Sequence, residues 1–322
     1  MKSYIFRKTL EALLLILGVT FLIFFIINLS TDGFKFETTF SPEAYPFQYA
    51  EYRASAGVEK SVILRYFDWL SGVLQGDLGK STRVIYRSIG EIISIHLPKS
   101  FILVFEALFF SIIVSIPLGV SLAIWSSNPI AKWLNGILTL GVGIPSFIPS
   151  LLTIYLLAVQ FNMLPVRPAY LSMDKMSFIQ IFLAQFKFSI LPTVGLSIGV
   201  ICTLTSFIRT SLLEVFKKDY IRTARAKGLT TFKINFKHAL KNAAIPWITM
   251  LGMAITVLLS ELFIVEKIFS WPGITKRLIE ALVQKDYHLV MGVSLYFTGV
   301  IVCINLAVDL GYGWLNPKIH YA

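Results

Sequence analysis

Residues 219–246 read "DYIRTARAKGLTTFKINFKHALKNAAIP", a basic and helix-prone stretch that lies between two long apolar runs. It holds one carboxylate, Asp219, against six cations: Arg222, Arg225, Lys227, Lys233, Lys237 and Lys241. Because a charged side chain is unfavourable inside lipid, a segment of this kind in an apolar chain belongs at a membrane surface. There it either sets the topology or contacts a partner.

The first part of this stretch is expected to form a short helix that ends in a tight turn. Asp219 is a suitable N-cap residue, and helix-forming residues continue from it to Lys227. Gly228 suits the position just after a helix, where the backbone turns left-handed. Ala224 and Ala226 keep this helix thin, so that it can lie close to another backbone.

A second helix is expected after the turn. Thr230 or Thr231 can cap it, and an apolar stripe recurs at every fourth position: Phe232, Phe236 and Leu240. Such a basic hairpin touches anionic lipid, binds nucleic acid or docks into a groove on a partner protein. No DNA-binding motif supports the second interpretation. Periodicity alone does not separate the first from the third.

The whole chain has the composition of an integral membrane protein. Of its 322 residues, 56% are hydrophobic and only 15% are charged, whereas an average soluble domain has roughly 25% charged residues. Continuous apolar runs of this length predict helices, because barrel strands alternate apolar and polar residues. Pro145 and Pro149 are expected to kink the third run. We predict an all-α membrane fold with six transmembrane helices, at residues 10–29, 101–125, 133–160, 188–208, 244–265 and 288–310.

Lysine and arginine counts orient the chain. Segment 209–243 carries nine basic residues, whereas segment 30–99 carries eight in twice the length, balanced by eight acids. Because cytoplasmic segments collect Lys and Arg, both termini are expected in the cytoplasm. The net charge of +11 then reflects topology rather than nucleic-acid binding. The first run is longer than a signal-peptide core and no small-residue cleavage site follows it, so we expect it to remain as a span.

Segment 30–99 is the one sizeable region expected outside the membrane. Residues 62–76 have apolar positions at helical spacing, so an amphipathic helix is predicted that ends near Gly76. Residues 84–98 predict a second amphipathic helix before the second span. The two helices either lie in the interface plane or form a packed extracytoplasmic cap.

The sequence holds no motif for catalysis, for a cofactor or for a metal ion. The stretch "GDLGKST" at 76–82 has only two residues between its glycines, so it is not a phosphate-binding loop. Cys202 and Cys303 lie in apolar runs, as is typical of small buried residues. The histidines are scattered without ligand spacing: His96, His238, His288 and His320. A protein that is not an enzyme is expected.

Residues 220–246 resemble the cytoplasmic coupling loop of bacterial ABC importer permeases. The broad signature of that family is Glu-Ala-Ala, three residues, Gly, nine residues, then Ile-x-Leu-Pro, and the chain matches it at Ala224, Gly228 and Leu240. "RTARAKG" followed by "HALKN" is similar to the version found in dipeptide, oligopeptide and nickel permeases. The departures from the broad signature are Arg222, Thr223, His238 and Lys241.

Further motifs of that branch occur in order: GDLGKS (76–81), LPKS (97–100), IPLG (116–119), VEKIFSWPGI (265–274), KDY (285–287) and NLAVDLGYGWLNPKI (305–319). The resemblance is to the B-type permease subunit of oligopeptide or dipeptide transporters, and it implies the type I ABC importer permease fold. It also implies an N-terminal tail and first span in 1–29, an extracytoplasmic segment in 30–99, and a core in 100–322. That core would hold five spans and the coupling loop 209–243.

The resemblance implies that the chain works with partners in a bacterial plasma (inner) membrane. These are a second homologous permease, two ATP-binding subunits that hydrolyse ATP and an extracytoplasmic solute-binding protein. Peptides are the expected solutes; nickel or another small solute in the same architecture, or a self-sufficient secondary transporter, are the alternatives. The implied coupling residues are Arg222, Thr223, Ala224, Arg225, Ala226, Lys227, Gly228, His238 and Leu240.

Two further features are candidates for the substrate path. Glu261 and Glu106 place carboxylates inside apolar runs, where an acid is unfavourable and marks a functional candidate. Glu261 either lines the path or meets another subunit. The turn formed by Trp271, Pro272 and Gly273 either ends the fifth span or faces the binding protein at the mouth of the path.

Overall fold

The computed structural model describes residues 2–29, 61–81, 87–166 and 178–315. The chain divides into two compact units: residues 1–97 with 277–306, and residues 98–276 with 307–320. Within the described residues the regular structure is helical, and the only β-type pairing is an isolated bridge between Lys80 and Ser88. An all-α fold was the prediction, and it is confirmed.

The first unit contains α1 (Lys2–Leu29), α3 (Val62–Leu74) and parts of α4 (Ile89–Ile124), α10 (Ile274–Val283) and α11 (Tyr287–Leu315). Tyr66 joins α3 to α1, because its hydroxyl lies 3.0 Å from Thr20 Oγ1 and donates to the carbonyl of Leu17 at 3.2 Å. Helix α3 ends before Gly76, whose φ of 84° lies in the left-handed region. The predicted amphipathic helix and its end are therefore confirmed.

The second predicted amphipathic helix is not a separate element. Residues 89–98 belong to α4 (Ile89–Ile124), a 36-residue helix that continues through Pro98 into the second span; residues 84–86 lie outside the described part. Buried residues recur before and after the proline, as Ile93 and Leu103 illustrate. Packing on both sides explains why Pro98 fails to end the helix, although it removes one backbone donor.

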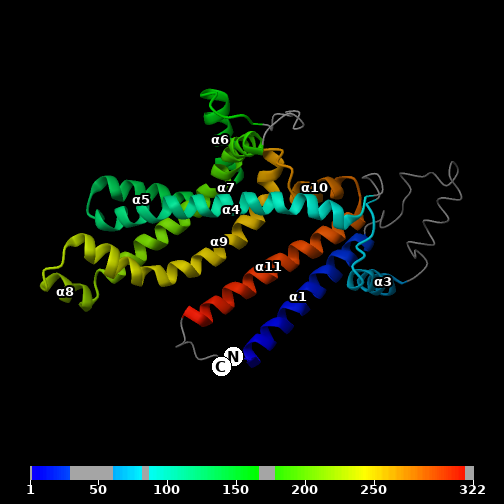
Figure 1. The fold of residues 1–322 in the computed structure, drawn as a ribbon, viewed down its shortest axis with the longest axis horizontal. Coiled ribbons are helices and arrows are strands. Elements are labelled where there is room, and N and C mark those ends of the chain that lie inside the picture. The colour runs from blue at the N-terminus through cyan, green and yellow to red at the C-terminus, as the bar shows by residue number, and fades with distance from the viewer. Residues whose placement is uncertain (1, 30–60, 82–86, 167–177, 316–322) are drawn as a thin grey trace. The chain divides into compact units, whose positions relative to one another are not determined.

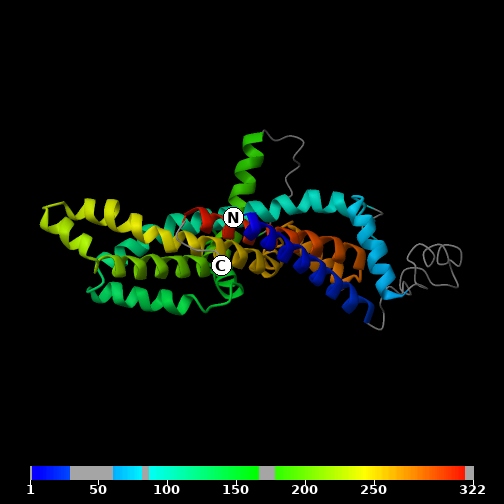
Figure 2. The same cartoon turned by 90° about the horizontal axis from the view of Figure 1, so that it is seen from below.

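Helix α7 (Phe178–Val215) is the central helix of the second unit. It packs against α5 (Pro129–Gly141), α6 (Phe147–Thr153) and α9 (Leu240–Ile268). Figures 1 and 2 show α7 and α9 side by side along much of their length. Buried Ser and Thr side chains recur along α7, as expected where small polar residues let membrane helices approach.

The third predicted span is broken rather than kinked. Residues 129–142 and 147–160 form two helical pieces bent by 117°, and the second piece ends in the π-helix η1 (Ile154–Gln160). Gly143 and Pro145 lie in the break. Glycine gives the backbone more freedom. Proline lacks an N–H and disfavours helical conformation in the residue before it. Prolines within α4, α7 and α9 leave those helices continuous.

The remaining spans match the predicted runs with shifted ends. Five helices in the described residues are long and apolar enough to cross a membrane, or six if the bent pair counts as one span. Helix α10 (Ile274–Val283) precedes the last of them, α11 (Tyr287–Leu315). The prediction of six spans is confirmed, and the five unbroken candidates are Phe6–Leu29, Ile89–Ile124, Gln185–Val215, Pro246–Ile268 and Tyr287–Val308.

Candidate functional site

The basic hairpin begins with α8 (Asp219–Ala226), a helix that Lys218 rather than Asp219 precedes as N-cap. Asp219 is the first helical residue, and its carboxylate lies 3.4 Å from the guanidinium of Arg222. An acid in the first turn still favours the helix, because it faces the positive end of the helix dipole. The expectation that Asp219 caps the helix is therefore wrong by one position.

The turn after α8 has the predicted left-handed conformation. Gly228 has a φ of 74°, its amide donates to the carbonyl of Arg225 at 3.0 Å, and Leu229 N donates to Ala224 O at 3.3 Å. Gly228 is exposed, and no atom of the described residues lies within 4 Å of the place that a Cβ would occupy. A Cβ added here therefore meets open space within the part of the chain that the structure describes.

The second arm of the hairpin differs from the predicted α-helix. Lys233–Ala239 form the π-helix η3, which passes directly into α9 without a break. Thr230 caps this arm as expected, because its hydroxyl accepts from Lys233 N at 3.4 Å. The second arm of the hairpin and the fifth span are therefore one continuous helical element, and π-helical winding often marks functional segments.

The predicted apolar stripe of this arm does not form a single face. The rings of Phe232 and Phe236 lie tilted against each other, with centroids 4.6 Å apart, and they are 70% and 44% exposed. Leu240 is half-buried and lines a cavity at the base of the hairpin. The three positions therefore differ in burial and do not form one buried face.

Side chains of the hairpin divide into an inner and an outer set. Ala224 is buried with Ile221, Ile234 and Ala239, so its small side chain serves the packing between the two arms. The sequence had suggested instead that Ala224 allows a partner to approach. His238 is half-buried at the base, and the exposed set is Arg222, Thr223, Arg225, Ala226, Lys227 and Gly228.

A buried carboxylate, Glu266, lies near the end of α9 and was not singled out from the sequence. Its side chain is fully buried and accepts from Ser100 Oγ at 2.5 Å, from Thr275 Oγ1 at 2.5 Å and from Lys276 N at 3.0 Å. Ser100 in turn accepts from Ile274 N at 2.9 Å. We call these residues the Glu266 cluster. The positions of Ser100, Glu266 and Ile274 inside the LPKS and VEKIFSWPGI motifs were the signal that the sequence offered.

The Trp271–Gly273 turn packs against this cluster. The ring of Trp271 is buried and stacks on Phe188 with centroids 5.2 Å apart, while its Nε1 donates to Lys99 O at 3.1 Å. A Cβ on Gly273 would overlap the Glu266 carboxylate, so only glycine fits. Packing inside the second unit accounts for Trp271 and Gly273, and Pro272 is half-buried. A contact between this turn and a binding protein stays a prediction.

The two candidate carboxylates have different surroundings. Glu106 accepts from Thr193 Oγ1 at 3.0 Å. Glu261 is half-buried, and its Oε2 is shielded from solvent without a hydrogen-bond partner among the described residues. A carboxylate in a span is unfavourable without a partner, so Glu261 differs from Glu106 in lacking a donor among the described residues.

A second pair of motifs meets in the first unit. Ser81 of GDLGKS donates to Asp286 of KDY at 2.5 Å, and Asp286 also accepts from Leu289 N at 3.3 Å. Asp286 is almost fully buried and lies directly before α11. Two motifs separated by about two hundred residues in the sequence therefore act together as a helix cap and an anchor.

The apolar spans and the exposed basic hairpin define a multi-pass helical membrane protein of the permease type. Residues 115–321 match the family model described as "Binding-protein-dependent transport system inner membrane component". The chain belongs to this family, the membrane permeases of ABC importers. The family predicted from the motifs is confirmed, and with it the type I permease fold.

Relatives match across most or all of the chain. It is 30% identical to the oligopeptide transport system permease protein AppB of Bacillus subtilis over 100% of both chains. It is 33% identical to the dipeptide transport system permease protein DppB of the same organism, over 81% of this chain and 80% of that protein. It is 28% identical to the glutathione transport system permease protein GsiC of Salmonella typhimurium over 100% of both.

Proposed function

We propose that this chain is one of two permease subunits of an ATP-driven importer of small peptides. The relatives named above are permeases for oligopeptides, a dipeptide and glutathione, and these solutes share a peptide backbone. A second homologous permease completes the pathway. Two ATP-binding subunits hydrolyse ATP, and an extracytoplasmic binding protein delivers the solute, so this chain itself is not catalytic.

The exposed face of the hairpin carries the coupling in this proposal. Its cations offer charge to a groove on an ATP-binding subunit, and Gly228 allows a close approach. The exposed rings of Phe232 and Phe236 add apolar contact. Because η3 runs into α9 without a break, a displacement of the hairpin moves the fifth span as one rigid element. His238 and Leu240 lie at the base, where that motion enters the span.

The remaining sequence-based assignments fit the same scheme. The N-terminal tail and first span occupy 1–29, segment 30–99 faces outward and receives the binding protein, and 100–322 forms the core. Both termini lie in the cytoplasm of a bacterial cell, because the hairpin is the most basic segment of the chain. Glu261 obtains its missing donor from the second permease, and Pro272 lies where the turn approaches the binding protein.

Gly228→Trp tests the coupling face directly. The variant should insert and fold as wild type, since among the described residues nothing lies within 4 Å of the added Cβ, but transport should be lost because the bulk cannot enter a close-fitting groove. Solute uptake and the amount of permease in the membrane are the two measurements. Gly228→Ala is the matched control: it adds the same left-handed strain of about 1–2 kcal/mol without bulk, and it should keep most transport. Normal uptake by Gly228→Trp would show that the hairpin does not dock in this way.

Affinity purification from the native membrane tests the whole assignment. Mass spectrometry should recover two ATP-binding subunits, a second permease and a binding protein together with this chain. The recovered binding protein is then titrated with di- and oligopeptides and with nickel chelates. Peptide binding supports the proposed solute, whereas exclusive binding of a metal chelate assigns the importer to the nickel alternative. Recovery of this chain alone, even after crosslinking, would mean a self-sufficient transporter.

A further inference from the structure

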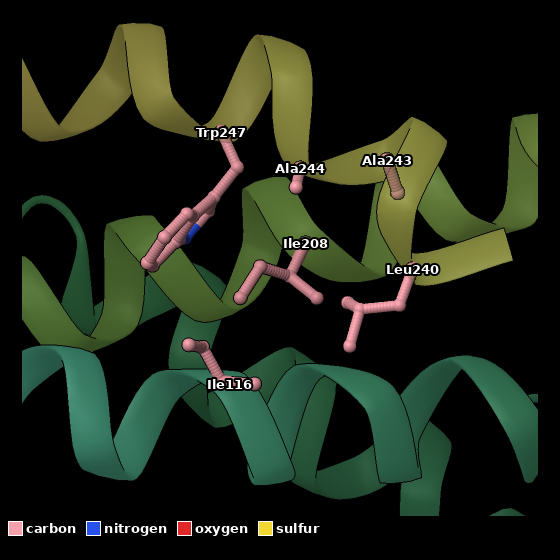
Figure 3. Close-up of a pocket in the computed structure, with 6 residues that line it drawn as sticks. All are labelled: Ile116, Ile208, Leu240, Ala243, Ala244 and Trp247. Atoms are coloured by element: carbon pink, nitrogen blue, oxygen red, sulfur yellow. The ribbon is translucent and has the colours of Figure 1, made fainter. Parts of the chain in front are cut away.

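A small apolar cavity lies in the second unit at the base of the hairpin. Figure 3 shows six side chains that line it, from α4, α7 and α9. Its volume is about 160 Å³. Five of the lining residues are aliphatic and the sixth is a tryptophan; they are Ile116, Ile208, Leu240, Ala243, Ala244 and Trp247.

Trp247 gives this cavity a single polar atom. The side chain is 8% exposed, and its Nε1 is shielded from solvent without an acceptor among the described residues. In Figure 3 the indole nitrogen lies on the edge of the ring that faces Ile208, toward the other lining side chains. A buried donor without an acceptor is unfavourable, so a guest that supplies an acceptor has an advantage over one that does not.

The size of the cavity limits the guest. An engineered protein cavity of about 150 Å³ lined by Leu, Ile and Phe stays dry and binds benzene. The cavity of about 160 Å³ at the base of the hairpin is partly open, and by volume it accommodates one six-membered ring with a short substituent. Charged and strongly polar molecules are excluded, because the aliphatic walls offer nothing to replace their hydration.

We propose that this cavity is a binding site for a small apolar molecule that carries one hydrogen-bond acceptor, such as a cyclic ketone. The apolar body packs against Ile116, Ile208 and Leu240, and the acceptor oxygen receives the hydrogen bond from Trp247 Nε1. The site recognises its ligand by shape and by one polar contact.

The position of the cavity gives the ligand a route to regulation. It lies between α9, which continues from the hairpin, and the helices α4 and α7. A molecule wedged here holds the base of the hairpin away from α4 and α7, so it restrains the motion that couples ATP hydrolysis to the fifth span. This effect on coupling rests on the proposed function, whereas binding itself does not.

Binding of a matched pair of probes to the purified chain in lipid nanodiscs tests the site. The probes are cyclohexanone and methylenecyclohexane, which have nearly the same shape but differ in the acceptor. Saturation-transfer NMR should detect binding of both, with the ketone tighter by roughly 2- to 12-fold, the range expected for one net hydrogen bond. Equal affinities, or no binding of either probe, would overturn the proposal.

Two variants separate the site from general uptake into lipid. Trp247→Phe keeps the apolar cavity but removes the N–H, so it should abolish the preference for the ketone and leave the hydrocarbon affinity nearly unchanged. Ala244→Leu fills the cavity and should remove saturable binding of both probes. If Ala244→Leu fails to fold, the Trp247→Phe comparison still decides. An unchanged ketone preference in Trp247→Phe would refute the role of the indole.

The outcome is independent of the partners. If the chain binds the ketone saturably but no ATP-binding subunits copurify with it, the binding site is supported and the proposed importer function is refuted. If the partners copurify but the ketone does not bind, the binding site is refuted and the importer function still stands. In the assembled complex, cyclohexanone should lower solute-stimulated ATP hydrolysis in wild type and have no effect in Ala244→Leu.

Discussion

The Glu266 carboxylate joins segments that are 166 positions apart in the sequence, because Ser100 donates to it across the second unit. Each polar atom of the cluster has a partner: Ser100 donates to Glu266 and accepts from Ile274 N, while Thr275 and Lys276 satisfy the second oxygen. A buried polar network that is fully satisfied holds one conformation, since every alternative leaves a group unpaired. The cluster therefore fixes how the second span starts against the end of the fifth.

Glu266→Gln should destabilise the protein although it hardly changes the side-chain volume. In either orientation the amide group faces a donor, toward Ser100 or toward Thr275 and Lys276, and leaves a buried proton without an acceptor. The expected loss is roughly 1–3 kcal/mol, measured as a lower midpoint of thermal unfolding in detergent. Glu91→Gln, which alters an exposed side chain paired to Arg87 at 3.8 Å, should leave the midpoint unchanged. Equal midpoints for the two variants would contradict a structural role for the cluster.

At the scale of elements, α7 brings its neighbours close by means of a small residue. A Cβ on Gly195 would lie 2.6 Å from Ser150 Oγ and 2.9 Å from Ser150 Cα, so the two backbones nearly touch. One turn further along the same helix, a Cβ on Gly199 would meet nothing within 4 Å. Membrane helices associate through such close packing, because lipid offers no hydrophobic drive for one helix to prefer another.

Gly195→Ala should weaken the contact between α6 and α7, because backbone atoms cannot move aside as a flexible side chain can. Gly199→Ala is the matched control and should be neutral or stabilising by up to about 1 kcal/mol, since alanine favours the helix. Cys202 is buried, so its reaction with a maleimide dye on heating reports unfolding in a Cys303→Ser background. If Gly195→Ala unfolds at the wild-type temperature, the close packing of these helices is not required for stability.

At the scale of the whole molecule, the distribution of basic residues predicts which end of each span is cytoplasmic. Segment 209–243 is the most basic part of the chain, and the structure shows the cations of its hairpin exposed. Gln75, at the end of α3, is also exposed and belongs to the segment expected outside. These two positions give opposite expectations in a labelling experiment.

Single cysteines at Lys227 and at Gln75, in a Cys202→Ala and Cys303→Ala background, test the topology. Intact cells treated with a membrane-impermeant maleimide should label Gln75→Cys strongly and Lys227→Cys only after permeabilisation. The physical reason is that positively charged loops are retained on the cytoplasmic side. The reverse pattern would place both termini outside and would remove the hairpin from the reach of ATP-binding subunits.

Local pattern was enough to predict much of the fold. Apolar runs marked the spans, the helical spacing of residues 62–76 marked α3, and Gly228 marked the turn, because each depends on residues near in sequence. Patterns failed where distant packing decides. Residues 84–98 looked like a separate helix, but packing on both sides of Pro98 keeps α4 continuous, and the third run breaks by 117°. At the candidate site, periodicity found the hairpin but not its π-helical arm or the burial of Ala224.

The amino-acid sequence by itself determined that this is an all-helical membrane protein with a basic hairpin, because hydrophobic length and local backbone preference are properties of short segments. Its motifs also determined the family. Only the tertiary structure decided which face of the hairpin is exposed, that Glu266 joins two motifs, and that Trp247 lines a cavity with an N–H that has no acceptor among the described residues. These features depend on how whole helices pack. In lipid that packing follows from small residues and hydrogen bonds between distant positions, which hydrophobic pattern does not record.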